Sequence, residues 1–198
     1  MLTTVAKNAA LDGITIADVS AHTAYSAAGA SEVSGGSPAY ARRAISFAAA
    51  SSGSRAASST PTFDIPASTT VRFLGLWGQG SPSNFLGMFA LGGSEKEIIS
   101  AQLGSPEGVI TVTAHGYSTN DQVVFYGGTP PAPLVEGTLY YVINAQTDTF
   151  SVSATQGGAG IPLTAHADGE VKVSKVVPET LGSQGTLQVS SASIALNA

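Results

Sequence analysis

Residues 138–154, TLYYVINAQTDTFSVSA, contain two runs of alternating residues on either side of a short polar connection at 145–148. In the first run Tyr140 and Val142 alternate with Tyr141, and the second run, TFSVS, alternates in the same way. A period of two is typical of β-strands, and a tight polar turn between two such runs indicates an antiparallel hairpin. This stretch therefore predicts a finished β-module near the middle of the chain.

The hairpin is part of a series of short strand-like runs between residues 108 and 177. The runs are VITVTAH, QVVFYGG, GTLYYVIN, TFSVSAT, IPLTAH and GEVKVSK. Gly, Asn, Asp or Pro stands at nearly every junction between them, which is typical of turns. Pro followed by Glu occurs at 106–107 and again at 178–179, as if at two sides of one linker. We expect a small β-barrel module over residues 108–178.

The residues before this module predict a short helix followed by strands. Apolar residues recur with helical spacing in 2–12, LTTVAKNAALD, and Gly13 can end the helix. Strand-like runs follow, separated by Gly, Pro and Ser-rich turns; they are ITIADVSAHT, RRAISFAAA, a short strand around Phe63 and Ile65, TTVRFLGLW and NFLGMFALGG. The segment SSGSRAASST reads as a loop. Short strands with regular turn signals favour a β-sandwich or a jelly roll.

The last residues, GTLQVSSASIALNA, alternate again and supply one or two amphipathic strands. A lone strand is not stable by itself, so we expect this segment to pair back onto the first part of the chain. The prediction is an all-β protein with two domains. Residues 1–107 with 179–198 form a β-sandwich or jelly-roll domain with a short N-terminal helix, and 108–178 form an inserted small β-barrel.

The composition limits what the protein can bind. The chain has 198 residues, no cysteine, 8 basic against 13 acidic residues and a net charge of -5. Thiol chemistry and disulfides are thereby excluded, and there is no basic stripe that would neutralise nucleic-acid phosphates. No run approaches the roughly 18 apolar residues of a membrane span. We therefore expect a soluble protein with neither nucleic acid nor membrane as a partner.

The patterns of catalytic and metal sites are weak in this sequence. His115 and His166 occur in similar contexts, TAHGYST and TAHADGE, and a metal site would need Asp121 or Asp168 as a third ligand. The preferred interpretation is that each histidine caps the end of a strand. No G-x-S-x-G nucleophile elbow is present, and the Gly-Gly pairs precede neither Lys-Ser/Thr nor a helix. We expect no catalytic residue, no cofactor and no metal.

Three aromatic residues are candidates for contact with partners. Aromatic rings stack on the apolar faces of sugars, and the cluster around the hairpin therefore nominates Tyr126 and Tyr141 as surface glycan contacts. Alternation puts Tyr140 and Tyr141 on opposite faces of the sheet, so one of the two belongs to the core. Trp77, the one tryptophan, is a candidate interface residue, although sealing a sandwich core is the commoner role.

Several segments carry a resemblance to a known family. The runs GASEVSGGSPAYARRAISFAAASSGSR, TFDIPASTTVRFLGLW and GTLQVSSASIALNA together resemble tailed-bacteriophage virion proteins of the tail-fibre-like or minor structural type. This resemblance covers about 1–104 and 179–198. Residues 108–177 are similar to a small barrel that recurs in phage structural proteins and is known as the first catalytic cysteine half-domain in ubiquitin-activating enzymes. Nothing enzymatic follows, because the chain has no cysteine.

The resemblance implies a non-enzymatic structural protein on the virion surface of a tailed phage. Such a protein would be a capsid decoration, a head fibre or a tail-fibre-like appendage. It would contact other virion proteins through the first domain, project the inserted barrel and assemble as a homotrimer. Two alternatives stay open: a receptor-binding tail protein that recognises host-surface glycan through the inserted module, and a cell-wall hydrolase.

Overall fold

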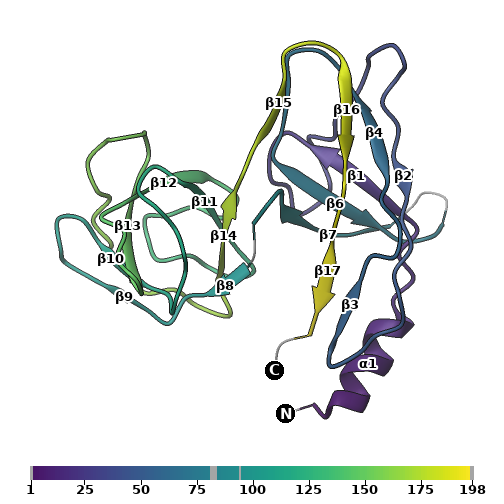
Figure 1. The fold of residues 1–198 in the computed structure, drawn as a ribbon. Coiled ribbons are helices and arrows are strands. Elements are labelled where there is room, and N and C mark those ends of the chain that lie inside the picture. Colours follow the sequence, from purple (N-terminus) through teal and green to yellow (C-terminus); the bar gives the residue numbers. More distant parts are fainter. Residues whose placement is uncertain (1, 81–83, 94, 197–198) are drawn as a thin grey trace. The chain divides into compact units, whose positions relative to one another are not determined.

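The computed structural model describes residues 2–80, 84–93 and 95–196 (Figure 1). The chain divides into two compact units. The first consists of Met1–Phe89 together with Glu179–Ala198, and the second is Ala90–Pro178. The return to the first unit lies between residues 178 and 179, where the sequence analysis places it. The second unit begins at Ala90, before the expected residue 108, because two further strands join its sheet.

The first unit contains a four-stranded sheet with the order β2-β1-β6-β7. These strands are β1 (Asp18–His22), β2 (Arg43–Ala44), β6 (Phe73–Trp77) and β7 (Phe85–Ala90). β1 and β6 pair over their whole length, from Asp18 opposite Trp77 to His22 opposite Phe73. Every residue of β6 is buried, so this strand forms the centre of the first unit.

The C-terminal segment pairs with the first unit, in three antiparallel two-stranded ribbons. The pairs are β15 (Glu179–Leu181) with β5 (Thr69–Val71), β16 (Gly185–Gln188) with β4 (Thr62–Ile65), and β17 (Ser193–Ala195) with β3 (Ser54–Ala56). Figure 1 shows β16 and β17, in yellow, beside strands from the first third of the chain. The C-terminal residues therefore complete the unit that the N-terminal residues begin.

The ribbons also correct three sequence-based expectations. The run 42–50 forms a strand only at Arg43–Ala44, whereas the expected loop around 51–60 contains β3. The run 69–77 is divided into β5 and β6 at Arg72, whose backbone N–H donates to His22 O at 2.9 Å.

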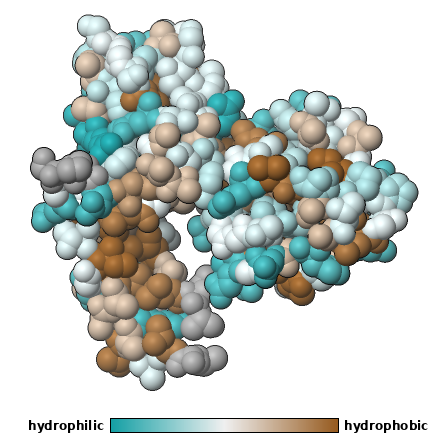
Figure 2. All heavy atoms as spheres, turned by 180° about the vertical axis from the view of Figure 1, so that it is seen from behind, coloured by the Kyte–Doolittle hydropathy of each residue, from teal (hydrophilic) through white to brown (hydrophobic). Residues whose placement is uncertain are grey.

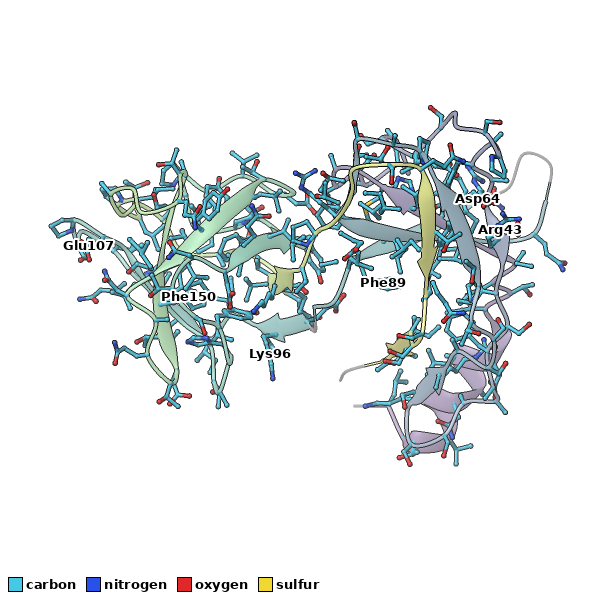
Figure 3. The ribbon with its side chains drawn as sticks, turned by 45° about the horizontal axis from the view of Figure 1, so that its top comes forward. Arg43, Asp64, Phe89, Lys96, Glu107 and Phe150 are labelled. Atoms are coloured by element: carbon cyan, nitrogen blue, oxygen red, sulfur yellow. The ribbon has the colours of Figure 1, made fainter. Side chains whose placement is uncertain are left out.

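An ion pair between Arg43 and Asp64 joins β2 to β4, and the two side chains point toward one another (Figure 3).

The predicted helix is present as α1 (Thr4–Gly13), with Thr3 as its N-cap. The expected apolar face is not buried, because Leu2 and Val5 are 53% and 79% exposed while Leu11 is buried. Polar contacts hold the helix instead. Arg55 of β3 donates to the backbone carbonyl of Leu11 at 2.8 Å. Capping of a terminal carbonyl by a guanidinium group satisfies an acceptor that the helix leaves open.

The second unit is a seven-stranded antiparallel sheet with the order β8-β14-β11-β12-β13-β10-β9. Its strands are β8 (Glu95–Glu97), β9 (Ser100–Gln102), β10 (Val109–Thr111), β11 (Gln122–Tyr126), β12 (Leu139–Ile143), β13 (Thr149–Ser153) and β14 (Lys172–Val176). The predicted hairpin is confirmed as β12 and β13, with Val142 opposite Val152. The run IPLTAH at 161–166 forms no strand, although Leu163 within it is buried.

The sheet of the second unit curls into a barrel. β8 and β9 occupy the two ends of the strand order, yet only residues 98 and 99 separate them in the chain. The backbone N–H of Ile98 donates to Val171 O and that of Ile99 donates to Thr111 O, so this short segment bridges both ends. The bend at residues 98 and 99 thus connects the two end strands, β8 and β9, while β8 pairs with β14 and β9 pairs with β10. Residues 95–97, before the expected start of the module at residue 108, thus form a strand of the barrel.

Each unit has its own core, and the fold is all-β, with antiparallel sheets in a sandwich-like arrangement and, over residues 2–80, 84–93 and 95–196, one short helix. The core of the second unit includes Phe125, Tyr140 and Phe150, all buried. Figure 3 shows Phe150 among the strands of this unit. Burial of each large apolar side chain contributes about 1.5–3 kcal/mol.

Candidate functional site

The two tyrosines nominated for sugar contact lie in different environments. Tyr126, at the end of β11, is only 7% exposed. Burial is the largest cause that raises the pKa of its phenol, followed by the charge of nearby Glu95. A ring enclosed in this way offers no face to a sugar, so the nomination of Tyr126 is wrong. Tyr140 is also buried, and its hydroxyl accepts the Val135 backbone N–H at 2.9 Å.

Tyr141 lies on the other face and is half-buried. The strand register places Gln122 of β11 directly opposite Tyr141 of β12, and Gln122 is also opposite Val176 of β14. Residues directly opposite in an antiparallel sheet point to the same face. The three side chains therefore form a row across three adjacent strands, with Tyr141 as its aromatic member.

A hollow of about 400 Å³ lies around this row. Its lining combines polar and apolar surface, and the lining residues all belong to the second unit; they are Asn120, Asp121, Gln122, Tyr141, Gln156, Lys175, Val176, Val177 and Pro178. The hollow is an open depression on the surface of this unit. Of the residues nominated from sequence, Tyr141 lies here, and so does Asp121, which was considered as a metal ligand.

The charged groups of the hollow neutralise one another. Lys175 Nζ lies 2.8 Å from Asp121 Oδ2, and the same oxygen accepts the backbone N–H of Ser118 at 2.8 Å. The ion pair is partly exposed, so its contribution to stability is about 0–1 kcal/mol. Its larger effect is to fix Asp121 at the mouth of the hollow and to leave the site without net charge.

Neutral polar groups in the hollow lack partners within the protein. Within the part of the chain that the structure describes, the buried Oε1 of Gln122 has no hydrogen-bond partner, while its Nε2 donates to Tyr141 Oη at 3.1 Å. Turning this amide over would exchange the two atoms and leave Nε2 unpaired instead. A buried polar atom without a partner costs about 1–3 kcal/mol. Such a cost is commonly repaid when a ligand or water supplies the missing partner.

Trp77, nominated as an interface residue, is 8% exposed and lies in the interior of the first unit. Its Nε1–H donates to Ser20 Oγ at 2.6 Å, and the Arg42 guanidinium stacks 3.3 Å from the ring centroid. Stacking of a cation on tryptophan is the strongest form of this contact. Phe85 packs edge-on against the same indole at 5.0 Å between ring centroids. Trp77 therefore seals the core and is not an interface residue.

Ser20 connects Trp77 to a buried histidine. Ser20 Oγ lies 2.6 Å from His22 Nε2, and His22 Nδ1 lies 2.8 Å from the Ala30 carbonyl oxygen. Because a carbonyl oxygen only accepts, Nδ1 carries the proton and Nε2 accepts from the serine hydroxyl. Burial lowers the pKa of His22 below its ordinary value of 6.5. The imidazole is thus held neutral within a hydrogen-bonded chain.

The Ser20–His22 pair has the spacing of a nucleophile and its base. Both residues are 0% exposed, and Trp77 donates to the serine oxygen that would attack a substrate. The pair is therefore part of the interior of the sheet. Sequence reasoning missed it, although Ser20 and His22 stand two residues apart in a strand and so share a face.

The remaining histidines are not brought together as a metal site. His115 is buried, its Nδ1 accepts the Tyr117 N–H at 2.9 Å, and its Nε2 lies 3.3 Å from Thr149 O. His166 is exposed. Among the described residues no group of three His, Asp or Glu side chains is placed to hold a metal ion. For His115, the strand-end capping interpretation matches the geometry.

Apolar side chains reach the surface of both units. In the first unit they are Leu2, Val5, Ile14 and Leu86, and in the second they are Ile99, Val135 and Val177. Figure 2 shows hydrophobic surface gathered on part of the first unit. Patches of this kind commonly mark sites of protein association.

No family model matches the chain, and neither a curated protein nor a solved structure matches it. In the described part of the chain, no helix has the length and apolar character needed to cross a membrane. The geometry above is therefore the source for functional inference. Gln122, Gln156 and Lys175 were not nominated from sequence, since isolated polar residues on strands and turns carry no signal before the register is known.

Proposed function

We propose that this chain is a non-enzymatic structural protein on the virion surface of a tailed bacteriophage. It would serve as a capsid decoration or head fibre, or as a tail-fibre-like appendage. The first unit docks onto other virion proteins and the second unit is displayed. The proposal extends the resemblance of residues 1–104 and 179–198 to phage virion proteins.

The observation that carries the proposal is the closure of the first unit by the C-terminal strands. β15, β16 and β17 pair with β5, β4 and β3, so the barrel leaves the first unit at Phe89 and returns to it at Glu179. A module tethered at both ends can be displayed without contributing to the fold of its carrier. This organisation suits an accessory protein whose two parts have separate tasks.

Assembly as a homotrimer through the first unit is part of the proposal. α1 is held by polar contacts to residues 50–55, which leaves Leu2 and Val5 exposed. The exposed side chains of Leu2 and Val5 are accessible for contact with a second copy or a virion protein. Closed symmetric assemblies are the usual form of homo-oligomers.

The test is to follow two truncated chains in phage particles produced by cells that carry the phage genome. In one variant residues 90–178 are replaced by a short Gly-Ser linker, and in the other residues 90–178 are expressed alone. The first should be incorporated into purified particles and the second should not. Absence of the full-length chain from purified particles, or incorporation of the isolated barrel, would refute the proposal.

A further inference from the structure

We propose that the hollow around Tyr141 in the second unit binds a neutral saccharide. The site consists of the Tyr141 ring, the amide groups of Asn120, Gln122 and Gln156, and the Asp121–Lys175 pair. This inference names a ligand class for a specific site and does not depend on a virion role.

The first argument is the combination of one ring with several planar polar groups. A sugar ring has an apolar face formed by C–H groups and a rim of hydroxyls, so it needs a flat apolar surface beside donors and acceptors. Tyr141 supplies the ring, and its place in the row with Gln122 brings an amide beside it. Small-molecule sites generally use a few placed polar groups to fix orientation in this way.

Two of the amide side chains around the hollow are accessible to a ligand. The side chains of Asn120 and Gln156 are exposed and, among the described residues, make no hydrogen bond within the protein, whereas Gln122 Oε1 is unpaired but buried. Lys175 Nζ has three protons, of which one is directed to Asp121. Each amide offers both donors and acceptors, which is what a ligand rich in hydroxyl groups can pair with.

The third argument is charge. Asp121 lies opposite Lys175 at 2.8 Å, so the site has no net charge to attract an anion or a cation. An anionic sugar would bring a carboxylate close to Asp121, and like charges at such distances repel. A neutral, hydroxylated ligand brings no charge close to Asp121 and is not repelled. The expected ligand is therefore a neutral hexose or N-acetylhexosamine unit, and sialic and uronic acids should not bind.

The full chain should be applied to a printed array of neutral and anionic glycans, and a bound neutral sugar should then be titrated as the free monosaccharide by NMR. Tyr141→Ala should weaken binding about tenfold, equal to about 1.4 kcal/mol. Tyr141→Phe keeps the ring and should retain most of the affinity. Tyr25→Ala changes a half-buried tyrosine of the first unit and serves as the matched control, with unchanged binding expected.

If Tyr141→Ala fails to fold, Gln156→Ala replaces it, because Gln156 is exposed and lies in the turn after β13. This variant should weaken binding at least about threefold, since one hydrogen bond to the ligand is lost. The inference is overturned if no neutral glycan binds, if only anionic glycans bind, or if the site variants bind as well as the Tyr25→Ala control.

Discussion

Replacing Gly75 by alanine tests whether the buried polar network holds the central strands of the first unit together. Gly75 lies in β6, opposite Ser20 of β1. A Cβ atom added there would lie 2.6 Å from His22 Nε2 and 2.7 Å from Ser20 Oγ, closer than such atoms approach in real proteins. Both side chains are 0% exposed, and Trp77 and the Ala30 carbonyl hold the two ends of the network.

The expected loss of stability is the balance of three effects. Forcing a methyl group into a packed interior costs about 1–3 kcal/mol. Separating Ser20 from His22 leaves a buried polar group without its partner, at a further cost of about 1–3 kcal/mol. Alanine restricts the unfolded chain and returns about 0.4–1 kcal/mol. The free energy of unfolding of the first unit should therefore fall by about 3 kcal/mol.

Tryptophan fluorescence during urea unfolding measures this change, because Trp77 is the one tryptophan of the chain and lies in the network itself. With a slope of about 2 kcal/mol per molar urea, the midpoint should fall by about 1.5 M. Gly182→Ala is the matched control, since a Cβ there would have nothing within 4 Å. A Gly75→Ala midpoint within about 0.25 M of the unchanged protein would refute the reasoning.

Four other outcomes are expected. Burial lowers the pKa of His22, so below about pH 6.5 the unfolded chain binds more protons than the folded chain. The stability of the first unit should therefore decrease as the pH falls, and not as it rises. Trp77 emission during urea unfolding measures this stability at each pH. Phe150→Ala should destabilise the second unit by about 3–5 kcal/mol in calorimetry while the Trp77 transition stays in place. Deleting 179–198 should unfold the first unit and shift Trp77 emission to that of exposed indole; native emission would contradict the ribbon pairing. Val5→Asp should reduce the mass of the assembly in ultracentrifugation without loss of helical circular dichroism, whereas Val135→Asp should leave the mass unchanged. If the Val5→Asp assembly has the same mass as the unchanged protein, α1 is not part of the proposed interface.

The hairpin and the return of the C-terminal segment could be predicted because each depends on a local rule. Period-two alternation around a polar turn identifies β12 and β13, and it correctly separates Tyr140 from Tyr141. The C-terminal strands had to pair with something, since a single strand is unstable. Neither conclusion requires knowledge of which strands are neighbours across the sheet.

The start of the second unit was missed because its first strands break the alternating pattern. Ile98 and Ile99 are adjacent, and the chain turns at this pair from one end of the strand order to the other. A segment that bends within the barrel does not keep one face toward the core. Glu95 and Glu97 are both exposed, so the run shows no apolar alternation that would indicate a strand.

The burial of Tyr126 could not be predicted from the alternating pattern of its strand. Alternation assigns a side chain to one of two faces, but it does not say whether the second face is covered. In β11 the four residues from Val123 to Tyr126 are all buried, so both faces of this strand are enclosed at these positions. Tyr141 is only half-buried, because it lies opposite Gln122, the half-buried first residue of β11.

The polar residues of the hollow could not be predicted from the sequence, because they come together only through the strand register. Asp121 and Lys175 lie far apart in the chain and meet only because β11 pairs with β14 in a register that places Gln122 opposite Val176. A shift of β11 by one residue against both β12 and β14 would turn Gln122 toward the core and leave Tyr141 without its amide neighbour. The hollow is therefore a property of strand register, and substitutions that preserve every lining residue but disturb the register should abolish it.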